Sequence, residues 1–132
     1  MPVSDKTLET PGRSLAIAAQ TLYLLNLLLL PGLAFLLLLG LYVSQRKRAP
    51  DLARNHLSQT VGVSLLGGAL ILCVITPALA LGGVHSGYTW MIVVLYFTFI
   101  HSTLILLGVL GLVKAMAGQH FRFPLVGRWF AA

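Results

Sequence analysis

Three long apolar runs without any charged residue constrain this chain more than any other feature. They cover residues 14–43, 57–83 and 88–113, and none of them contains Asp, Glu, Lys or Arg. Each run exceeds the ~20 residues that an α-helix needs to cross ~30 Å of hydrocarbon. The chain is 58% hydrophobic and only 9% charged, whereas about a quarter of the residues of a soluble domain are charged. The sequence therefore predicts an all-α integral membrane protein with a single membrane domain.

The cations outside these runs orient the predicted helices. Apart from Lys6 and Arg13, which share the N-terminal arm with acidic residues, they lie between the first two runs or after the third. These seven are Arg46, Lys47, Arg48, Arg54, Lys114, Arg122 and Arg128. Because Lys and Arg accumulate in the cytoplasmic parts of membrane proteins, we expect the first connection and the C-terminus to be cytoplasmic. The N-terminus and the loop with His85 would then lie outside, across a bacterial inner membrane.

The excess of cations also bears on the partners of the chain. A formal net charge of +6 would suggest nucleic acid in a soluble protein. Here the cations flank membrane spans, where anionic lipid attracts each Lys or Arg by about 1 kcal/mol. We therefore expect anionic lipid at the cytoplasmic face as a partner, and no nucleic acid. Cys73 is the single cysteine, so a cysteine-based metal site is not expected.

The first apolar run is too long for one crossing and too short for two. Its 30 residues would form a straight helix of about 45 Å. Pro31, followed by Gly32, lies at its centre, and a proline inside a helix removes a hydrogen bond and bends the axis. One interpretation is a single kinked helix over 14–44, and the other is a helix–break–helix element lying partly in the interface. We favour the kinked helix because the charge asymmetry fits an odd number of crossings.

The rest of the chain divides into two further helices, an arm and a tail. We expect an exposed arm over 1–13, helices over 51–82 and 88–117, and an interfacial tail over 118–132. Pro50 and Asp51 are typical of a helix start, where an acid complements the helix dipole. Tyr88 and Trp90 belong at the outer membrane–water boundary. The tail alternates aromatic rings with cations, which favours a position along the inner headgroups.

Small and polar residues inside the spans predict close helix packing. Ser64 and Gly68 have the four-residue spacing that lets two helices approach each other. Asn26 is a polar side chain within the first span and is expected to bond a neighbouring helix. The packing residues predicted in this way are Asn26, Ser64, Gly67, Gly68, Gly108 and Gly111.

His101 is the residue within the spans that most invites a functional role. It lies near the middle of the third span and shares a face with Thr98 and Ser102. An ionisable residue at this depth suggests a proton relay or a cofactor ligand. The alternative, which we favour, is a neutral histidine that bonds a neighbouring helix. Because His56 would lie at the cytoplasmic edge, the two histidines are not at one depth, as two haem ligands must be. We expect no cofactor.

The cytoplasmic rim holds the densest group of polar side chains. If the tail folds back beneath the helices, five of them meet at one surface: Arg54, His56, Gln59, Arg122 and Arg128. Such a surface would contact a lipid headgroup or an acidic segment of a partner, although ordinary membrane topology alone also places cations here. The sequence contains no recognisable catalytic set or phosphate-binding loop. We therefore expect a protein that is not an enzyme.

Two short stretches resemble a known family. Residues 53–59 read Ala-Arg-Asn-His-Leu-Ser-Gln, and residues 118–125 read Gly-Gln-His-Phe-Arg-Phe-Pro-Leu. Both resemble motifs of a widespread class of small bacterial membrane proteins of uncharacterised function. That class is distantly similar to the small membrane subunit of the chloroplast inner-envelope translocon. The resemblance implies a compact helical membrane unit, and it covers five positions of the rim: Arg54, His56, Gln59, Arg122 and Pro124.

Taken with the small extramembrane mass, these features favour a non-catalytic accessory or assembly subunit. Its helices would pack on other subunits of a larger membrane complex or on copies of the same chain. The alternative is a small channel-like or translocation component, in line with the distant resemblance. The predicted spans contain no Asp or Glu, and this argues against an ion-coupled carrier acting alone.

Overall fold

The computed structural model describes residues 10–131, and every regular element in that range is helical. The helices are α1 (Arg13–Leu28), α2 (Leu33–Gln45), α3 (Asp51–Gly82), α4 (Gly87–Leu95) and α5 (Ser102–Met116). A π-helix, η2 (Tyr96–His101), joins α4 to α5, and a 3-10 helix, η3 (Gly127–Phe130), lies in the tail. The prediction of an all-α protein is confirmed for the described residues. Most of the predicted arm, residues 1–9, lies outside them.

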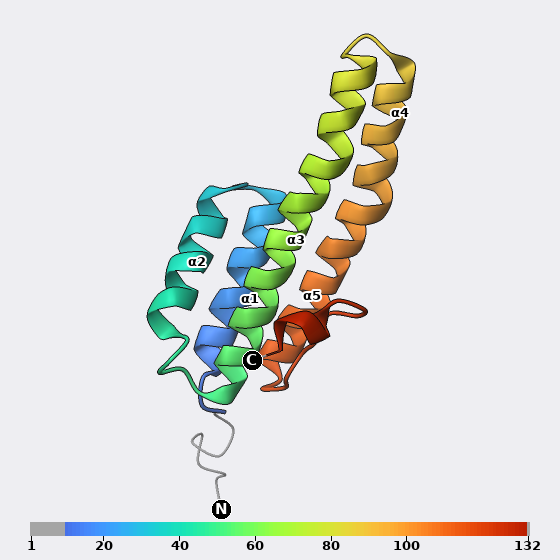
Figure 1. Cartoon of the computed structure of the whole chain (residues 1–132). Coiled ribbons are helices and arrows are strands. Elements are labelled where there is room, and N and C mark those ends of the chain that lie inside the picture. Colours follow the sequence, from blue (N-terminus) through green and yellow to red (C-terminus); the bar gives the residue numbers. More distant parts are fainter. Residues whose placement is uncertain (1–9, 132) are drawn as a thin grey trace, which may run out of the picture.

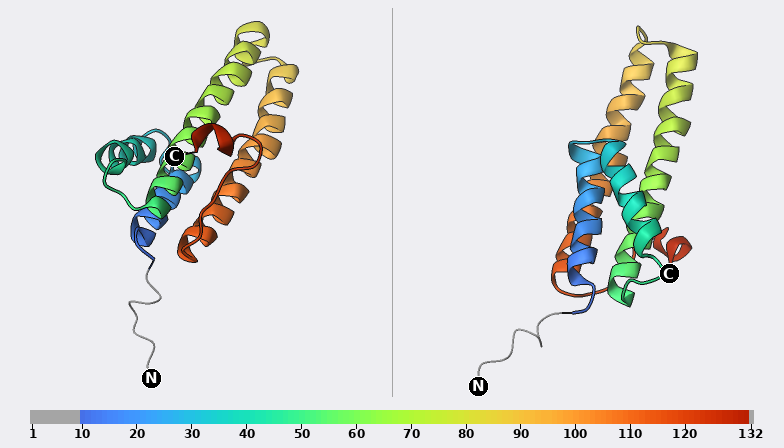
Figure 2. Two further views of the ribbon diagram at one scale, coloured as in Figure 1. Left: turned by 60° about the horizontal axis from the view of Figure 1, so that its bottom comes forward. Right: turned by 90° about the vertical axis from the view of Figure 1, so that its left-hand side faces the viewer.

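The helices form two antiparallel hairpins of different length (Figure 1). In the long hairpin, α3 has 32 residues, or roughly 48 Å. It is followed by α4, η2 and α5, which form one continuous helix over Gly87–Met116. In the short hairpin, α1 and α2 have 16 and 13 residues. The short hairpin lies beside one half of the long one, with α1 against both α3 and α5 and α2 against α3 (Figures 1 and 2).

The prediction of one kinked helix over 14–44 is wrong. The chain turns between α1 and α2, so that α2 runs back alongside α1. Gly32 adopts φ +85°, a left-handed conformation that glycine accepts at little cost. Asn26 Oδ1 accepts a hydrogen bond of 2.9 Å from the Gly32 backbone N–H. Pro31 and Gly32 therefore make a turn, stabilised by a side chain of α1, where a bend in a single helix was expected.

Because the first run folds back, both ends of the described chain lie at one end of the bundle (Figure 1). The Arg13 Nε–H donates to the Met116 carbonyl at 2.8 Å, and Gly12 lies against Ala53 at the start of α3. The predicted placement of the N- and C-terminal parts on opposite sides is therefore wrong for these residues. We call this end, formed by residues 10–13, 46–54 and 114–131, the basic end.

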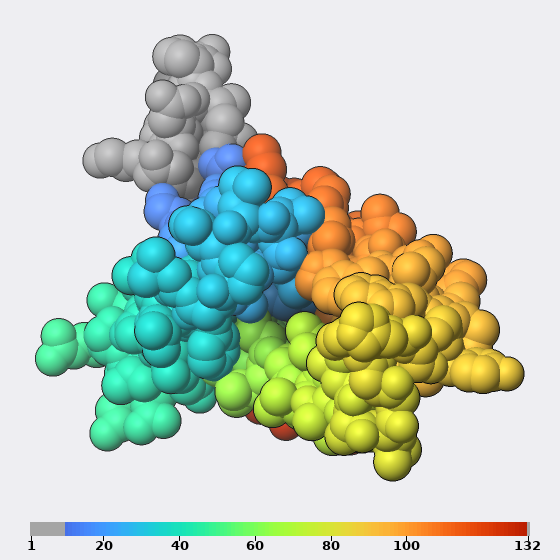
Figure 3. Space-filling view, turned by 90° about the horizontal axis from the view of Figure 1, so that it is seen from above, coloured from blue at the N-terminus to red at the C-terminus, as the bar shows by residue number. Residues whose placement is uncertain are grey.

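Most of the core lies in the half of the molecule next to the basic end. All buried residues of α3 lie between Leu52 and Gly67. Its partners on α1 recur every three or four residues and form one face of that helix: Ala16, Ala19, Gln20 and Tyr23. The alanines allow α1 to approach its neighbours closely. Beyond Gly67 the long hairpin continues without α1 and α2 beside it (Figure 1). Seen from above, α1 and α2 (blue to cyan) lie to one side of the far end of the long hairpin (yellow to orange; Figure 3).

The surface of the long hairpin is apolar. Its two helices have a mean hydropathy of 2.2 in their most apolar stretches, of which only 17% and 11% are buried. Such an exposed apolar surface is far larger than soluble monomers carry, and both helices are long enough to cross a membrane. The structure therefore supports a membrane-associated protein with two helices of spanning length. The predicted count of three spanning helices is not established, because α1 and α2 are each short.

Candidate functional site

The C-terminal tail folds beneath the helices and is held by side chains of α3. Asn55 Oδ1 accepts a hydrogen bond of 2.8 Å from the Phe121 backbone N–H. Gln59 Oε1 accepts one of 3.1 Å from the Phe123 N–H, and Gln59 Nε2 donates at 2.7 Å to the Gly127 carbonyl. Buried backbone groups must find partners, and residues 119–123 belong to no helix or strand that could supply them. The side-chain amides of Asn55 and Gln59 therefore supply the hydrogen bonds that a neighbouring strand would otherwise make to the tail backbone.

His56 joins the tail to α1. Its Nε2 lies 2.9 Å from the Gln119 carbonyl oxygen, and its Nδ1 lies 2.8 Å from Gln20 Nε2. A carbonyl oxygen only accepts hydrogen bonds, so Nε2 carries the proton, and Nδ1 accepts from the Gln20 amide. Both side chains are fully buried. The ring is therefore fixed as one neutral tautomer between two elements that are distant in sequence.

Two glycines of α5 leave room for the polar side chains of α1. A Cβ at Gly111 would lie 2.7 Å from both terminal amide atoms of Gln20. A Cβ at Gly108 would lie 2.5 Å from the Tyr23 ring. The Tyr23 hydroxyl donates to the Leu104 carbonyl at 3.0 Å. The glycines let α1 and α5 come close enough for these contacts.

The same tyrosine reaches the tail. The rings of Tyr23 and Phe123 have their centroids 5.5 Å apart, and Phe123 in turn packs edge-on against Phe121 at 4.9 Å. Tilted and edge-on aromatic pairs at such separations are favourable. Hydrogen bonds and ring contacts thus act together on the tail. We call the group that holds it the tail clasp, defined by Gln20, Tyr23, Asn55, His56 and Gln59.

The predicted polar rim is divided in two by this arrangement. His56 and Gln59 are fully buried, so the expectation that they contact lipid or a partner directly is wrong. They looked exposed because they lie near the predicted water boundary, but the tail covers them. Arg122 and Arg128 are exposed, and Arg54 is half-buried. These three remain available at the surface of the basic end.

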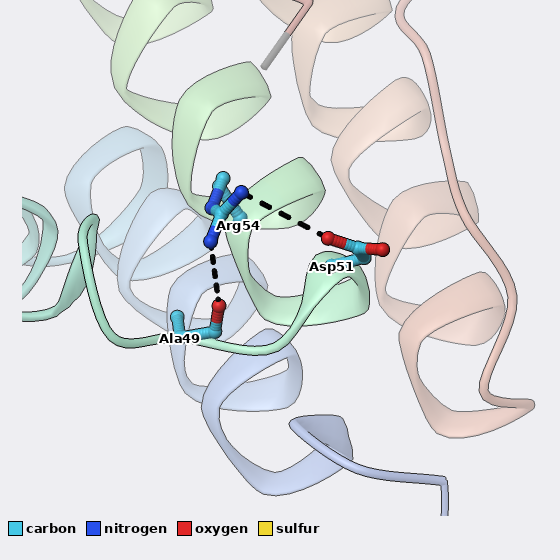
Figure 4. Close-up of polar contacts among 3 residues, drawn as sticks. All are labelled: Ala49, Asp51 and Arg54. Atoms are coloured by element: carbon cyan, nitrogen blue, oxygen red, sulfur yellow. Dashed lines mark hydrogen bonds and ion pairs between the residues drawn. The ribbon is translucent and has the colours of Figure 1, made fainter.

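Arg54 stabilises the connection between α2 and α3 (Figure 4). Its Nη2–H donates to the Ala49 carbonyl at 3.1 Å, and Nη1 lies 3.8 Å from the Asp51 carboxylate. The Asp51 side chain is 89% exposed, and exposed ion pairs of this kind contribute about 0–1 kcal/mol. The ion pair therefore leaves Arg54 able to interact with an anion.

The predicted packing residues of α3 occupy different surroundings. Gly67 is buried, a Cβ there would lie 3.4 Å from Leu104, and its carbonyl is 3.5 Å from the Tyr96 hydroxyl. Gly68 is exposed, and a Cβ there would meet nothing within 4 Å. Ser64 is half-buried, and its buried Oγ has no partner among the described residues. Gly67 thus lies in a helix contact within the chain, whereas Gly68 faces outward.

His101 lies at the end of η2 and faces the end of α1. Its Nε2 is 3.0 Å from the Leu27 carbonyl oxygen. The last four carbonyls of an α-helix have no partner within the helix, so this imidazole caps one of them. Thr98 and Ser102 are exposed, and Ser102 Oγ bonds the Phe97 carbonyl. The predicted polar face therefore does not converge on His101.

The contacts of the tail clasp position the tail against α1 and α3. Among residues 10–131, no group of three or more His, Cys, Asp or Glu side chains lies close enough to hold a metal ion. The sequence patterns did not identify Gln20, Tyr23 or Asn55 as parts of the site. Gln20 and Tyr23 are polar residues three apart within an apolar run, and this spacing puts them on one helix face. That signal could have identified α1 as a partner of the polar rim.

Comparison with known proteins assigns the chain to a family. A search of the curated proteins and a search of the solved structures found no match. The distant similarity to the chloroplast translocon is therefore not shown. The model of the magnetosome magnetite crystal formation protein family matches residues 12–130, which include the whole tail clasp and the tail that it holds. This agrees with the predicted membership in a small bacterial family. The chain belongs to the magnetosome magnetite crystal formation protein family.

Proposed function

We propose that this chain is a non-catalytic accessory membrane protein in magnetite crystal formation. The observation that carries the proposal is the tail clasp, which fixes the tail beneath the helices and leaves the cations of the basic end at the surface. Family membership supports a non-enzymatic accessory role in a membrane-associated process. The protein would offer partners a rigid cationic surface on an apolar anchor.

The charges of the chain support an indirect role over direct binding of iron. Oxygen and imidazole ligands that converge on one point are what an iron site requires. Asp51 is the single acidic residue between positions 10 and 131, and it lies beside Arg54. The described residues instead present an excess of cations, which repel metal ions. We therefore assign the chain to the assembly of the crystal-forming membrane, through contacts with lipid and with other subunits or copies of itself.

The proposal includes an arrangement in the membrane. With the basic end cytoplasmic, α3 and the helix over Gly87–Met116 cross a bacterial inner membrane or a membrane derived from it. The helices α1 and α2 are roughly 24 and 20 Å long, less than the ~30 Å of a hydrocarbon core. They would enter from the cytoplasmic side and turn within the bilayer. Asn26 supports this arrangement, since its bond to Gly32 satisfies a turn N–H that would otherwise face hydrocarbon.

Cysteine labelling tests the arrangement directly. In a Cys73→Ala background, Thr10→Cys and Ala131→Cys are expected to react with a membrane-impermeant maleimide from the same side, the cytoplasmic one. His85→Cys, in the loop at the far end, is expected to react from the other side. Labelling of Thr10→Cys and Ala131→Cys from opposite sides would contradict the proposed topology.

The role in crystal formation requires a cellular test. The host would be a magnetite-forming bacterium in which the gene for the host's member of this family has been deleted. This chain would be produced in the host, and the size of the crystals would be measured by electron microscopy. We expect the wild-type chain to restore crystal size, and an Asn55→Ala/Gln59→Ala variant at equal membrane abundance to fail. Ser58→Ala, which changes the same turn of α3 outside the tail clasp, serves as the matched control. Crystals unchanged by the wild-type chain would refute the proposed function.

A further inference from the structure

A groove of about 590 Å³ lies on the surface between α2, α3 and the end of the tail. Figure 2 shows the tail returning to α3 on this side of the molecule. The residues that line the groove are of two kinds. Three are cations, Arg46, Lys47 and Arg54, and most of the others are apolar, among them Val61, Leu65 and Trp129. Its volume falls within the ~300–1,000 Å³ typical of small-molecule sites.

The two kinds of lining residue lie at different depths. Arg46 and Lys47 follow the last residue of α2, and Arg54 lies in the first turn of α3, so all three are at the basic end. Leu65 lies eleven residues farther along α3 than Arg54, which is about 16 Å along the helix axis. The groove is therefore cationic at its mouth and apolar along its length.

The tail supplies one wall of the groove. The Phe130 ring packs on Gly62 so closely that no Cβ could fit there, and Trp129 beside it is 63% exposed. Because the tail clasp holds the tail, this wall is fixed and the groove does not depend on a mobile segment for its shape.

We propose that this groove binds an anionic phospholipid. Its headgroup phosphate would contact Arg46, Lys47 and Arg54, and one acyl chain would lie along Val61 and Leu65. Charge complementarity supports this occupant, since none of the residues that line the groove is acidic. An acidic protein segment would fit the mouth, but its backbone polar groups would lack partners along the apolar part. The proposal concerns a specific site and does not depend on the role in crystal formation.

Trp129 provides a reporter within the groove. The only other tryptophan, Trp90, lies in α4 near the opposite end of the molecule. A Trp90→Phe variant would be reconstituted into phosphatidylcholine vesicles containing brominated phosphatidylglycerol, and separately into vesicles containing brominated phosphatidylcholine at the same mole fraction. We expect the anionic lipid to quench Trp129 fluorescence at a severalfold lower mole fraction. Equal quenching by the two lipids would overturn the proposal, as would no quenching by either.

A matched pair of variants separates the groove from general attraction to a cationic surface. General attraction to an anionic surface accounts for about fivefold per cation, so Arg46→Gln/Lys47→Gln is expected to lower the preference for the anionic lipid by clearly more than about fivefold for each cation removed. Arg48→Gln removes an exposed cation of the same connection that does not line the groove, and it is expected to lower the preference by no more than about fivefold. A loss per charge as large for Arg48→Gln as for the double variant would refute a specific site.

Discussion

Replacing Gln59 by alanine gives the sharpest test of the tail clasp. The Gln59 side chain is fully buried and makes two hydrogen bonds to the tail backbone, at 3.1 Å to the Phe123 N–H and at 2.7 Å to the Gly127 carbonyl. Alanine leaves both backbone groups without a partner, and each such buried group costs about 1–3 kcal/mol. The tail should therefore lose about 2–6 kcal/mol of its binding free energy.

The assay is hydrogen exchange of the tail in detergent micelles, followed by mass spectrometry. Every 1.4 kcal/mol corresponds to a factor of ten in an equilibrium constant, so peptides over 119–127 should exchange at least ~30-fold faster in Gln59→Ala. Peptides from α4, at the far end of the long hairpin, should keep their rates. Ser58→Ala is the control, because Ser58 Oγ bonds the Asn55 carbonyl rather than the tail. Unchanged exchange in 119–127, or equal acceleration in Ser58→Ala, would refute the reasoning.

Two further substitutions test the contacts of α1. Gly111→Ala would place a Cβ 2.7 Å from the Gln20 amide and should lower the free energy of unfolding in detergent by about 1–3 kcal/mol. The control is Gly68→Ala, whose Cβ meets nothing within 4 Å and which should change the free energy of unfolding little. His101→Phe leaves the Leu27 carbonyl without its partner and should cost about 1–3 kcal/mol. If the wild-type protein had a visible absorption band that His101→Phe lost, His101 would instead be identified as a cofactor ligand.

The sequence was most informative where a pattern has one structural outcome. Charge-free apolar runs predict helices, and the helices over Asp51–Gly82 and Gly87–Met116 lie close to the ranges expected from the positions of Pro50 and Tyr88. A proline followed by glycine inside an apolar run has two outcomes, a bend or a reversal. The reversal places α2 against α3, a contact that the first run alone does not reveal, and it is accompanied by the bond of Asn26 to Gly32 within the run.

The burial of the candidate site also depends on contacts that the local sequence does not reveal. His56 and Gln59 could be recognised as special from their neighbours in sequence, but their burial depends on the tail, more than 60 residues away. A polar residue near a membrane boundary has a ready partner in water, so nothing local indicates that a backbone segment will replace that water. Gln20 and Tyr23 mark a polar face on α1, but their spacing is compatible with any neighbouring helix and does not identify His56 as the partner of Gln20.

The difference in length between the two hairpins gives the molecule a tapered profile. Four helices, α1, α2, α3 and α5, share the half next to the basic end, whereas the other half consists of α3 with α4 and η2 (Figure 1). In the proposed orientation the protein occupies more area in the cytoplasmic leaflet than in the opposite one. A wedge of this kind fits best where the cytoplasmic leaflet is convex, as it is around a small vesicle that buds inward. The fold itself would then favour the strongly curved membrane of an intracellular compartment over the flat membrane of the cell envelope.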